Sequence, residues 1–389
     1  MSPVGCGARE EDERTVSGAE AESFDALAEE LARVFAGGVD RPLSEREYDS
    51  WAVRIFRWQI AHNRAYRTYC AGRGATVERW TDVPPVPTSA FRHLRLLSVE
   101  GGRAPEALFR TSGTTRGPER RGRHPVASLA LYRAALLPML RAHLVPEGER
   151  LRVLSLVPAP ADAPDSSLAY MISTAMEELG TEESAWLARS DGTLDPERLL
   201  AALHAAADGG RPVVVAATAF SLLHALDLLD EAHARVRLPE GSRLMETGGF
   251  KGRSRTVERA ELYAAVDARL GIPEQRIVNE YGMTELLSQF YEPVLSAPPA
   301  PPLAERFHVA PPWVRTRVLD PVTLAPVPPG EPGLLCHHDL ANAGSVACLL
   351  TEDLGREMPG GLRLLGRVAG AEPRGCSLTA EELLRAAPP

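Results

Sequence analysis

The feature that most constrains the fold is the alternation, from residue 108 onward, of short apolar runs with segments of helical periodicity. The apolar runs that predict strands are Leu151–Val157, Val213–Ala217, Arg243–Glu246 and Arg276–Glu280. The helical patterns around them lie near residues 128–143, 166–179, 196–207, 220–234 and 256–270. Short strands separated by helices favour a parallel sheet built from β–α–β units, so we predict an α/β fold.

The segments on either side of this pattern have a different character. Residues 1–20 lack apolar periodicity and predict a disordered acidic tail, whereas residues 22–36 and 44–71 predict amphipathic helices. We therefore place an α/β core over residues 21–302 and a small, β-rich subdomain over residues 303–389. The runs that predict its strands follow the Pro-rich stretch Ala297–Pro302 and are Val314–Leu319, Gly333–His337, Ser345–Leu350 and Leu362–Leu365.

Composition narrows the class of function. The 389 residues are 44% hydrophobic, which is enough for a sizeable core, and the net charge of −9 disfavours a protein that coats nucleic acid. No stretch approaches the apolar length of a membrane span, and the polar N-terminus is unlike a signal peptide. We therefore expect a cytoplasmic protein with neither a nucleic-acid partner nor a membrane span.

The five cysteines indicate neither a disulfide framework nor a zinc site. Their number is odd and they form no CxxC pair. The run Cys336-His337-His338 lacks a second pair of ligands at a finger-like spacing and lies in an apolar stretch. We interpret it as part of a strand.

The first motif with chemical meaning begins at Thr111 and reads Thr-Ser-Gly-Thr-Thr-Arg-Gly-Pro. Its hydroxyls and backbone N–H groups suit an anion, and arginines follow at once, so Thr111, Ser112, Gly113, Thr114 and Thr115 predict a phosphate-binding loop. It is not a Walker A loop. A plain polar turn is the alternative.

The second motif, Asn279-Glu280-Tyr281-Gly282-Met283-Thr284-Glu285, follows a predicted strand, where ligands bind in open α/β sheets. An aromatic ring there can stack on a base, a threonine can meet a phosphate, and a carboxylate can hold Mg²⁺. A third motif places Asp353 in a turn that ends at Gly355, where it suits ribose hydroxyls, and Arg367 follows. The alternative for each is a structural turn.

The order of these motifs resembles the adenylate-forming superfamily of acyl-CoA ligases, luciferases and peptide-synthetase adenylation domains. The resemblance implies that the Thr/Ser/Gly loop handles the phosphates of ATP. It places Tyr281 on adenine, Thr284 on the α-phosphate, Glu285 on Mg²⁺ and Asp353 on ribose, with Arg367 assisting, and it counts Asn279 in the ATP site.

Longer stretches resemble one branch of it, the LuxE-type acyl-protein synthetases. They are FRTSGTTRGPERRGRH, PDSSLAYM, METGGFKGRSR, DLANAGSVACLLTEDLG and RGCSL, within residues 85–389. That family activates a fatty acid with ATP and passes the acyl group to a partner reductase. The resemblance therefore implies the adenylate-forming fold, a carboxylic-acid substrate, ATP and Mg²⁺ as cofactors, and an acyl reductase as partner.

Lysine usage marks one departure from the superfamily. Most members carry a further C-terminal domain with a catalytic lysine, whereas Lys251 is the only lysine among 43 basic residues here. It follows Gly248-Gly249, a step that the resemblance places close to adenine. A compact ammonium is not interchangeable with a guanidinium, so we predict that Lys251 is catalytic; survival of one surface lysine by chance is the alternative.

Cys376 is the predicted acyl acceptor. It lies in Arg374-Gly375-Cys376-Ser377-Leu378, where LuxE-type synthetases carry an acylated cysteine, and Arg374 would lower the pKa of a nearby thiol. A small apolar residue in a terminal strand is the alternative. The helix after Thr218-Ala219-Phe220 and the segment Ser166–Met176 are apolar candidates for the acyl pocket, and ordinary core is the alternative for both.

Other functions stay open at this point. An acyl- or aryl-CoA ligase would transfer to added CoA, and an aryl-acid adenylating enzyme of a secondary-metabolite pathway would stop at the adenylate. A non-catalytic scaffold would bind adenine nucleotide without exchanging pyrophosphate.

Overall fold

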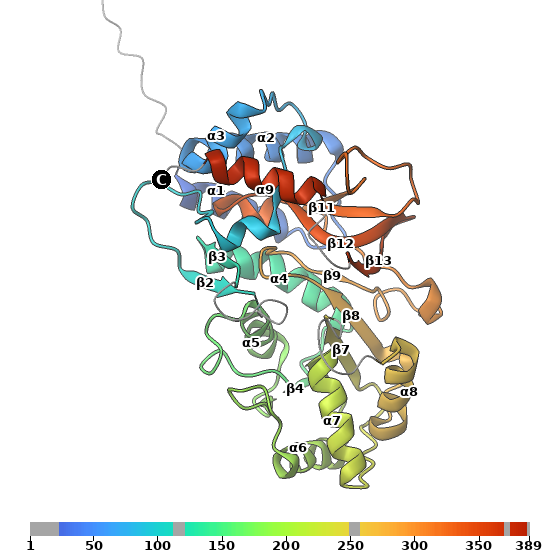
Figure 1. The fold of residues 1–389 in the computed structure, drawn as a ribbon. Coiled ribbons are helices and arrows are strands. Elements are labelled where there is room, and N and C mark those ends of the chain that lie inside the picture. The colour runs from blue at the N-terminus through green and yellow to red at the C-terminus, as the bar shows by residue number, and fades with distance from the viewer. Residues whose placement is uncertain (1–22, 112–120, 249–256, 369–373, 387–389) are drawn as a thin grey trace, which may run out of the picture.

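The computed structural model describes residues 23–111, 121–248, 257–368 and 374–386, and Figure 1 shows their arrangement. The predicted tail at residues 1–20 lies outside these ranges. The helices are α1 (Phe24–Phe35), α2 (Glu45–His62), α3 (Arg64–Gly72), α4 (Leu129–Leu144), α5 (Ser167–Leu179), α6 (Pro196–Asp208), α7 (Ala219–Glu231), α8 (Arg259–Leu270) and α9 (Arg374–Ala386). The strands are β1 (Val86–Pro87), β2 (Ala107–Arg110), β3 (Arg123–Val126), β4 (Arg152–Ser155), β5 (Ala185–Trp186), β6 (Val213–Thr218), β7 (Arg243–Thr247), β8 (Ile277–Tyr281), β9 (Phe290–Tyr291), β10 (Val314–Leu319), β11 (Gly333–Asp339), β12 (Cys348–Met358) and β13 (Gly361–Arg367).

The larger sheet has the order β5-β4-β6-β7-β8-β9 and is parallel except for the last pair. The α/β prediction is therefore confirmed, and each of its four predicted strands lies within a residue or two of an observed one. Side chains alternate between two apolar layers. Val214 and Met245 face α4 and α5, while Val215 and Leu244 face α6, α7 and α8. A parallel sheet covered on both faces needs such continuous apolar strands.

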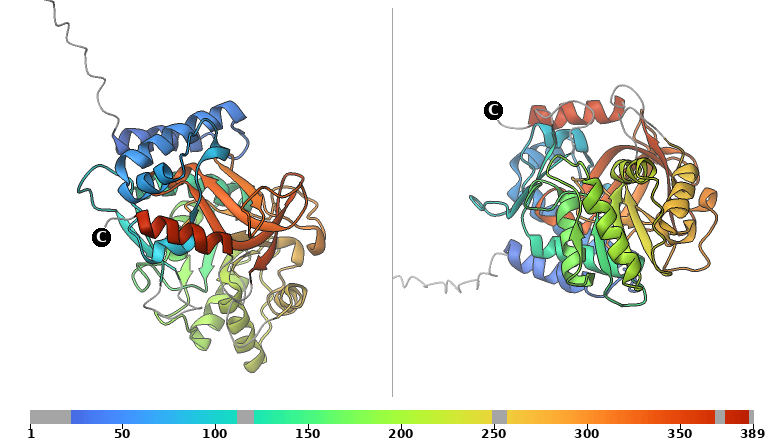
Figure 2. Two further views of the ribbon diagram at one scale, coloured as in Figure 1. Left: turned by 45° about the horizontal axis from the view of Figure 1, so that its top comes forward. Right: turned by 90° about the horizontal axis from the view of Figure 1, so that it is seen from below.

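The second sheet has the order β1-β12-β11-β10, with β13 added along β12. Its C-terminal strands are joined by a strand from far upstream, because Val86 pairs in parallel with Leu349. The N-terminal helices pack on the same core as this sheet, and α9 lies against α3 and β1 (Figures 1 and 2). The predicted boundary at residue 302 stays a prediction.

One local expectation was wrong. Thr351–Gly355 is not a turn but lies inside β12, which begins later than the predicted Ser345–Leu350 run and contains an irregular register beside Gly355. The helices predicted over residues 44–71 are confirmed as α2 and α3, and the side chain of Asn63 caps the start of α3. Cys376 lies in the helix α9 and not in a terminal strand. Within the described ranges, no helix combines the length and apolarity needed to cross a membrane.

A short segment of buried polar groups ties the two sheets together. Asp339 accepts hydrogen bonds from the backbone N and Oγ of Ser288 at 3.0 and 2.8 Å. Asn342 donates to the Glu285 carbonyl at 2.8 Å and accepts from the Leu287 N–H at 3.0 Å. Residues 285–288, which follow β8, are thus fixed by the last residue of β11 and by a residue just after it.

We predict that Asn342→Leu destabilises the protein by about 2–4 kcal/mol, because it leaves a buried carbonyl and a buried N–H without partners. Urea unfolding followed by circular dichroism measures the change. The matched control is Gln275→Leu at an exposed position, which should change the free energy of unfolding by less than about 0.5 kcal/mol. Equal stability of the two variants would contradict the tying role.

Candidate functional site

The stem of the predicted phosphate loop is the hairpin of β2 and β3. The Thr111 N–H donates to the Gly122 carbonyl at 3.1 Å, and the Gly122 N–H donates to Thr111 Oγ1 at 2.9 Å. Arg121 Nε donates to the Thr111 carbonyl. A Cβ on Gly122 would lie 3.2 Å from Glu285 Oε1, so the stem of the loop and the end of the second motif are close together.

Tyr281, at the end of β8, joins the second motif to the third. Its hydroxyl donates to Asp353 Oδ2 at 3.0 Å and lies 3.1 Å from His337 Nε2. Arg367 Nε donates to Asp353 Oδ1 at 3.0 Å, since Arg367 on β13 is the register partner of Asp353 on β12. Residues more than 70 positions apart therefore share one hydrogen-bonded group.

Glu285 is buried beside this group. Burial raises the pKa of its carboxyl to about 7, while its backbone hydrogen bond and the positive charges of Arg367 and Arg92 oppose the shift. A nearby positive charge favours the ionised form of a carboxyl. A buried carboxyl with a pKa near 7 therefore becomes ionised when a cation approaches. Thr284 is adjacent, and its carbonyl contacts His124 Nδ1 at 2.8 Å.

The structure thus brings together Thr111, Tyr281, Thr284, Glu285, Asp353 and Arg367 of the predicted site. Gly248 and Asn279 lie along a neighbouring cleft of about 330 Å³ between the parallel sheet and β13. Ser112, Gly113, Thr114, Thr115, Gly249 and Lys251 lie outside the described residues.

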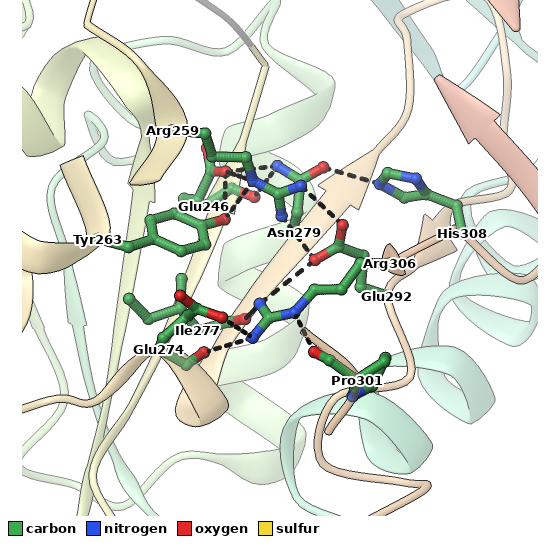
Figure 3. A network of polar contacts seen from close by, with 10 residues as sticks. All are labelled: Glu246, Arg259, Tyr263, Glu274, Ile277, Asn279, Glu292, Pro301, Arg306 and His308. Carbon is green, nitrogen blue, oxygen red and sulfur yellow. Dashed lines mark hydrogen bonds and ion pairs between the residues drawn. The ribbon is translucent and has the colours of Figure 1, made fainter. Parts of the chain in front are cut away.

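A buried ionic network supports the wall of this cleft (Figure 3). Arg259 makes two hydrogen bonds to Glu292, at 2.8 and 2.6 Å, and Arg306 Nη1 lies 3.7 Å from the same carboxylate. Arg306 also donates to the carbonyls of Ile277 and Glu274. Since these carbonyls flank the start of β8, the network fixes the strand that carries Asn279 and Tyr281.

Cys376 lies near the site although it is far along the chain. The residue is 1% exposed, and its thiol donates to the Thr351 carbonyl at 3.6 Å. Thr351 precedes Asp353 by two residues on β12. The thiol is therefore next to the strand that carries the predicted ribose ligand and is shielded from solvent.

A small apolar cavity of about 10 Å³ lies between α4, α5 and the parallel sheet, and Met171, Ile172 and Met245 line it. The predicted acyl-binding segment Ser166–Met176 therefore contributes to its wall. The helix after Thr218 is not among the lining elements. The cavity holds about one water molecule, so an acyl chain would require movement of side chains such as the flexible methionines.

Sequence reasoning missed several residues here. Arg92 forms an ion pair with Glu352 at 3.7 Å, and its positive charge lowers the pKa of the Glu285 carboxyl. It lies in a segment of the sequence that carries no motif. His337 was interpreted only as part of a strand. That strand is confirmed as β11, yet His337 also contacts Tyr281. Alternation along a strand, which turns every second residue to the same face, was the one available signal for the burial of His337.

Comparisons with known proteins agree with this geometry. The family described as acyl-protein synthetase, LuxE, matches residues 44–385. The chain belongs to this family.

Two curated relatives of this acyl-protein synthetase are long-chain-fatty-acid–luciferin-component ligases. The one from Vibrio harveyi is 26% identical over 85% of this chain and 86% of its own length. The one from Aliivibrio fischeri is 22% identical over 79% of this chain and 78% of its own length. The crystal structure of 2-hydroxyisobutyryl-CoA ligase in complex with its adenylate has a TM-score of 0.57 at 15% identity, covering 92% of this chain and 73% of that one. The predicted family and the adenylate-forming fold are confirmed.

We predict that Glu285→Gln stabilises the ligand-free synthetase at high pH. The folded protein raises the carboxyl pKa above its ordinary 4.5, so ionisation costs stability as pH rises through about 7, and no cost exists below about pH 4.5. Removing the charge should add about 3 kcal/mol at pH 8 and less than about 1 kcal/mol at pH 5.

Urea unfolding at the two pH values tests this, with Glu182→Gln at an exposed position as the control. The control substitution should change the free energy of unfolding by the same small amount at pH 5 and at pH 8. A Glu285→Gln variant that is less stable than wild type at pH 8 would show that the carboxylate is satisfied in the ligand-free protein.

Proposed function

We propose that this acyl-protein synthetase uses ATP to activate a carboxylic acid and then transfers the acyl group to the thiol of Cys376. The observation that carries the proposal is the convergence of the Thr111–Gly122 stem, Tyr281, Glu285 and the Asp353–Arg367 pair at one edge of the parallel sheet. The names of the two curated relatives favour a fatty acid as substrate.

In the first half-reaction an acid oxygen attacks the α-phosphorus of ATP, and pyrophosphate leaves. Two anions must be brought together, so alignment and neutralisation of charge provide the catalysis. Asp353 would hold the ribose, and Arg367 would hold Asp353 and face the phosphates. Thr111 and the loop that follows it would bind the departing pyrophosphate.

Glu285 fits the role of a Mg²⁺ ligand. The described residues contain no cluster of three or more metal-binding side chains, but Mg²⁺ commonly uses one or two carboxylates together with substrate phosphates. The raised pKa of the buried Glu285 carboxyl agrees with a site completed by a cation. When bound, the ion would supply stabilisation of charge on the phosphate oxygens.

In the second half-reaction the Cys376 thiolate attacks the acyl carbon, the bond to the AMP oxygen breaks, and AMP leaves. The thiol proton passes to solvent. The position of Cys376 beside Thr351 supports this role, because β12 leads from there to Asp353 within two residues. Burial of the thiol would protect the thioester from water until an acyl reductase partner takes the acyl group.

We predict that Cys376→Ser retains pyrophosphate exchange but forms no covalent acyl-enzyme with ATP, Mg²⁺ and a long-chain acid. Intact mass and release by neutral hydroxylamine identify the thioester in the wild type. Glu285→Gln is the matched control, because it should lower exchange by a hundred-fold or more, roughly, while keeping the thiol.

Two outcomes would contradict this assignment. One is labelling that survives in Cys376→Ser or maps to Cys336 or Cys348. The other is transfer to added CoA or release of free adenylate without labelling of the wild type, which would favour the CoA-ligase or aryl-acid alternatives. ATP binding without pyrophosphate exchange would favour a scaffold.

We predict that Lys251→Arg lowers pyrophosphate exchange by about ten-fold or more although the charge is kept. The single lysine follows Gly248 by three residues, and Gly248 lies on the cleft beside the site. A wide guanidinium cannot replace a compact ammonium against a phosphate or carboxylate oxygen. The control is Arg237→Lys at an exposed position that does not line the cleft. Equal exchange by Lys251→Arg and wild type would contradict a catalytic role.

A further inference from the structure

A chain of hydrogen bonds connects Asp353, the proposed ribose ligand, to a hydroxyl group on a distant strand. The chain starts at Thr316 on β10, where Thr316 Oγ1 lies 2.9 Å from His337 Nδ1. On the other side of the ring, His337 Nε2 lies 3.1 Å from the hydroxyl oxygen of Tyr281. That hydroxyl lies 3.0 Å from Asp353 Oδ2. The chain therefore links β10, β11 and β12 of the second sheet to β8 of the parallel sheet.

The donor and the acceptor nearest the site follow from the charge of Asp353. Arg367 Nε lies 3.0 Å from Asp353 Oδ1 in an ion pair, so the Asp353 side chain is a carboxylate, which only accepts hydrogen bonds. The Tyr281 hydroxyl has a single proton, and this proton must be directed at Asp353 Oδ2. The Tyr281 oxygen is therefore the acceptor on the side of His337.

The tautomer of His337 is determined by this direction. Burial lowers the pKa of His337 to about 4, although the charge of Asp353 opposes the shift, so the ring is neutral and carries one proton. That proton must be on Nε2, which donates to Tyr281, and Nδ1 then bears a lone pair. Thr316 Oγ1 donates to this lone pair. Since Thr316 is the register partner of His337 on the neighbouring antiparallel strand, the two side chains lie on the same face of the sheet.

The hydroxyl of Thr316 favours this tautomer over the alternative one. Without that donor, a neutral imidazole can carry its proton on Nδ1, and Nε2 then becomes an acceptor. Such an acceptor would compete with Asp353 for the single proton of Tyr281. Asp353 would then lose one of the donors that orient its carboxylate, although Arg367 would still donate to the other oxygen.

We propose that Thr316 is a positioning residue for recognition of the ribose of ATP, and that it acts on Asp353 through His337 and Tyr281. This rests on the proposed role of Asp353 as the ribose ligand. A carboxylate has about four acceptor sites, so the donors Tyr281 and Arg367 fix its orientation without excluding ribose hydroxyls. Thr316 is not a catalytic residue, because Asp353, and not Thr316, would contact the ribose.

The test compares the dissociation constants of ATP and of dideoxy-ATP, which lacks both ribose hydroxyls, by calorimetry with Mg²⁺ and without any acid. Wild type should bind ATP more tightly by about ten-fold or more, because the analogue cannot donate to the carboxylate of Asp353. Thr316→Val keeps the shape of the side chain but removes the donor, so this ratio should fall to about three-fold or less. Thr316→Ser keeps a hydroxyl and should keep the wild-type ratio. Weaker binding of both nucleotides with an unchanged ratio in Thr316→Val would show a merely structural role and overturn the proposal.

A double-mutant cycle tests the route through Tyr281. Tyr281→Phe removes the hydroxyl that donates to Asp353 and should lower the ratio at least as far as Thr316→Val does. The double variant should have the ratio of Tyr281→Phe alone, because Thr316 has no route to Asp353 once that hydroxyl is absent. Losses that add in the double variant would contradict the assignment.

The wild-type measurements separate this inference from the proposed function. Equal binding of ATP and dideoxy-ATP by wild type would overturn the ribose role of Asp353 and the role of Thr316 with it, but pyrophosphate exchange would still support the use of ATP. A wild type that binds neither nucleotide would defeat the proposed function as well.

Discussion

The site depends first on the contact by which Asp339 and Asn342 hold residues 285–288. These four residues follow the last parallel strand, where the chain must turn toward the second sheet, and their backbone groups are too deeply buried to be satisfied by water. A carboxylate and an amide supply the missing partners from the end of β11. Burial raises the pKa of Asp339 to about 6, but bonds from Ser288 and from the Ala341 N–H favour its charge, so it stays ionised at neutral pH. Without this contact the direction of Glu285 would not be defined.

Elsewhere in the site, ionisable side chains are likewise buried where water is excluded. Glu246, Glu280 and Glu285 are all buried, and burial raises the pKa of each carboxyl. Each has a different compensation: the charge of Arg259 with hydrogen bonds from Tyr263 and Asn279 for Glu246, a hydrogen bond from Thr247 for Glu280, and a backbone hydrogen bond with more distant arginine charges for Glu285. Glu285 is the one that relies on its own backbone and remote charges, which suits a carboxyl that gains its main partner only when ligand arrives. The other two serve to position strands and side chains.

The sequence predicted the parallel sheet because buried strands such as Val213–Thr218 are apolar on both faces, a pattern that does not depend on the rest of the chain. It predicted Thr111, Tyr281, Glu285, Asp353 and Arg367 as one site only through the order of motifs. Tertiary packing sets the physical contacts between them. These contacts are the register pairing of Asp353 with Arg367 and the hydrogen bond from Tyr281 to Asp353, 72 residues further along the chain. For the same reason the sequence did not indicate that Arg92 and His337 lie at the predicted site. The turn predicted at Thr351–Gly355 was wrong because pairing with β11 and β13 on both sides outweighs the local preference of glycine and aspartate.

The position of α9 links the two proposed half-reactions. The helix packs against α3 and β1, and β1 in turn pairs with β12 beside Leu349 and Leu350. Cys376, near the start of α9, is thus held against the strand that carries Asp353, while Arg73 and Glu382 anchor the helix farther along with an exposed contact at 2.5 Å. Exposed ion pairs contribute little stability, so the buried residues Cys376, Thr379 and Leu383 hold the helix in place. Because these buried residues hold α9 against the core, the thiol of Cys376 lies beside β12, and the proposed transfer of the acyl group would take place next to the strand that carries Asp353.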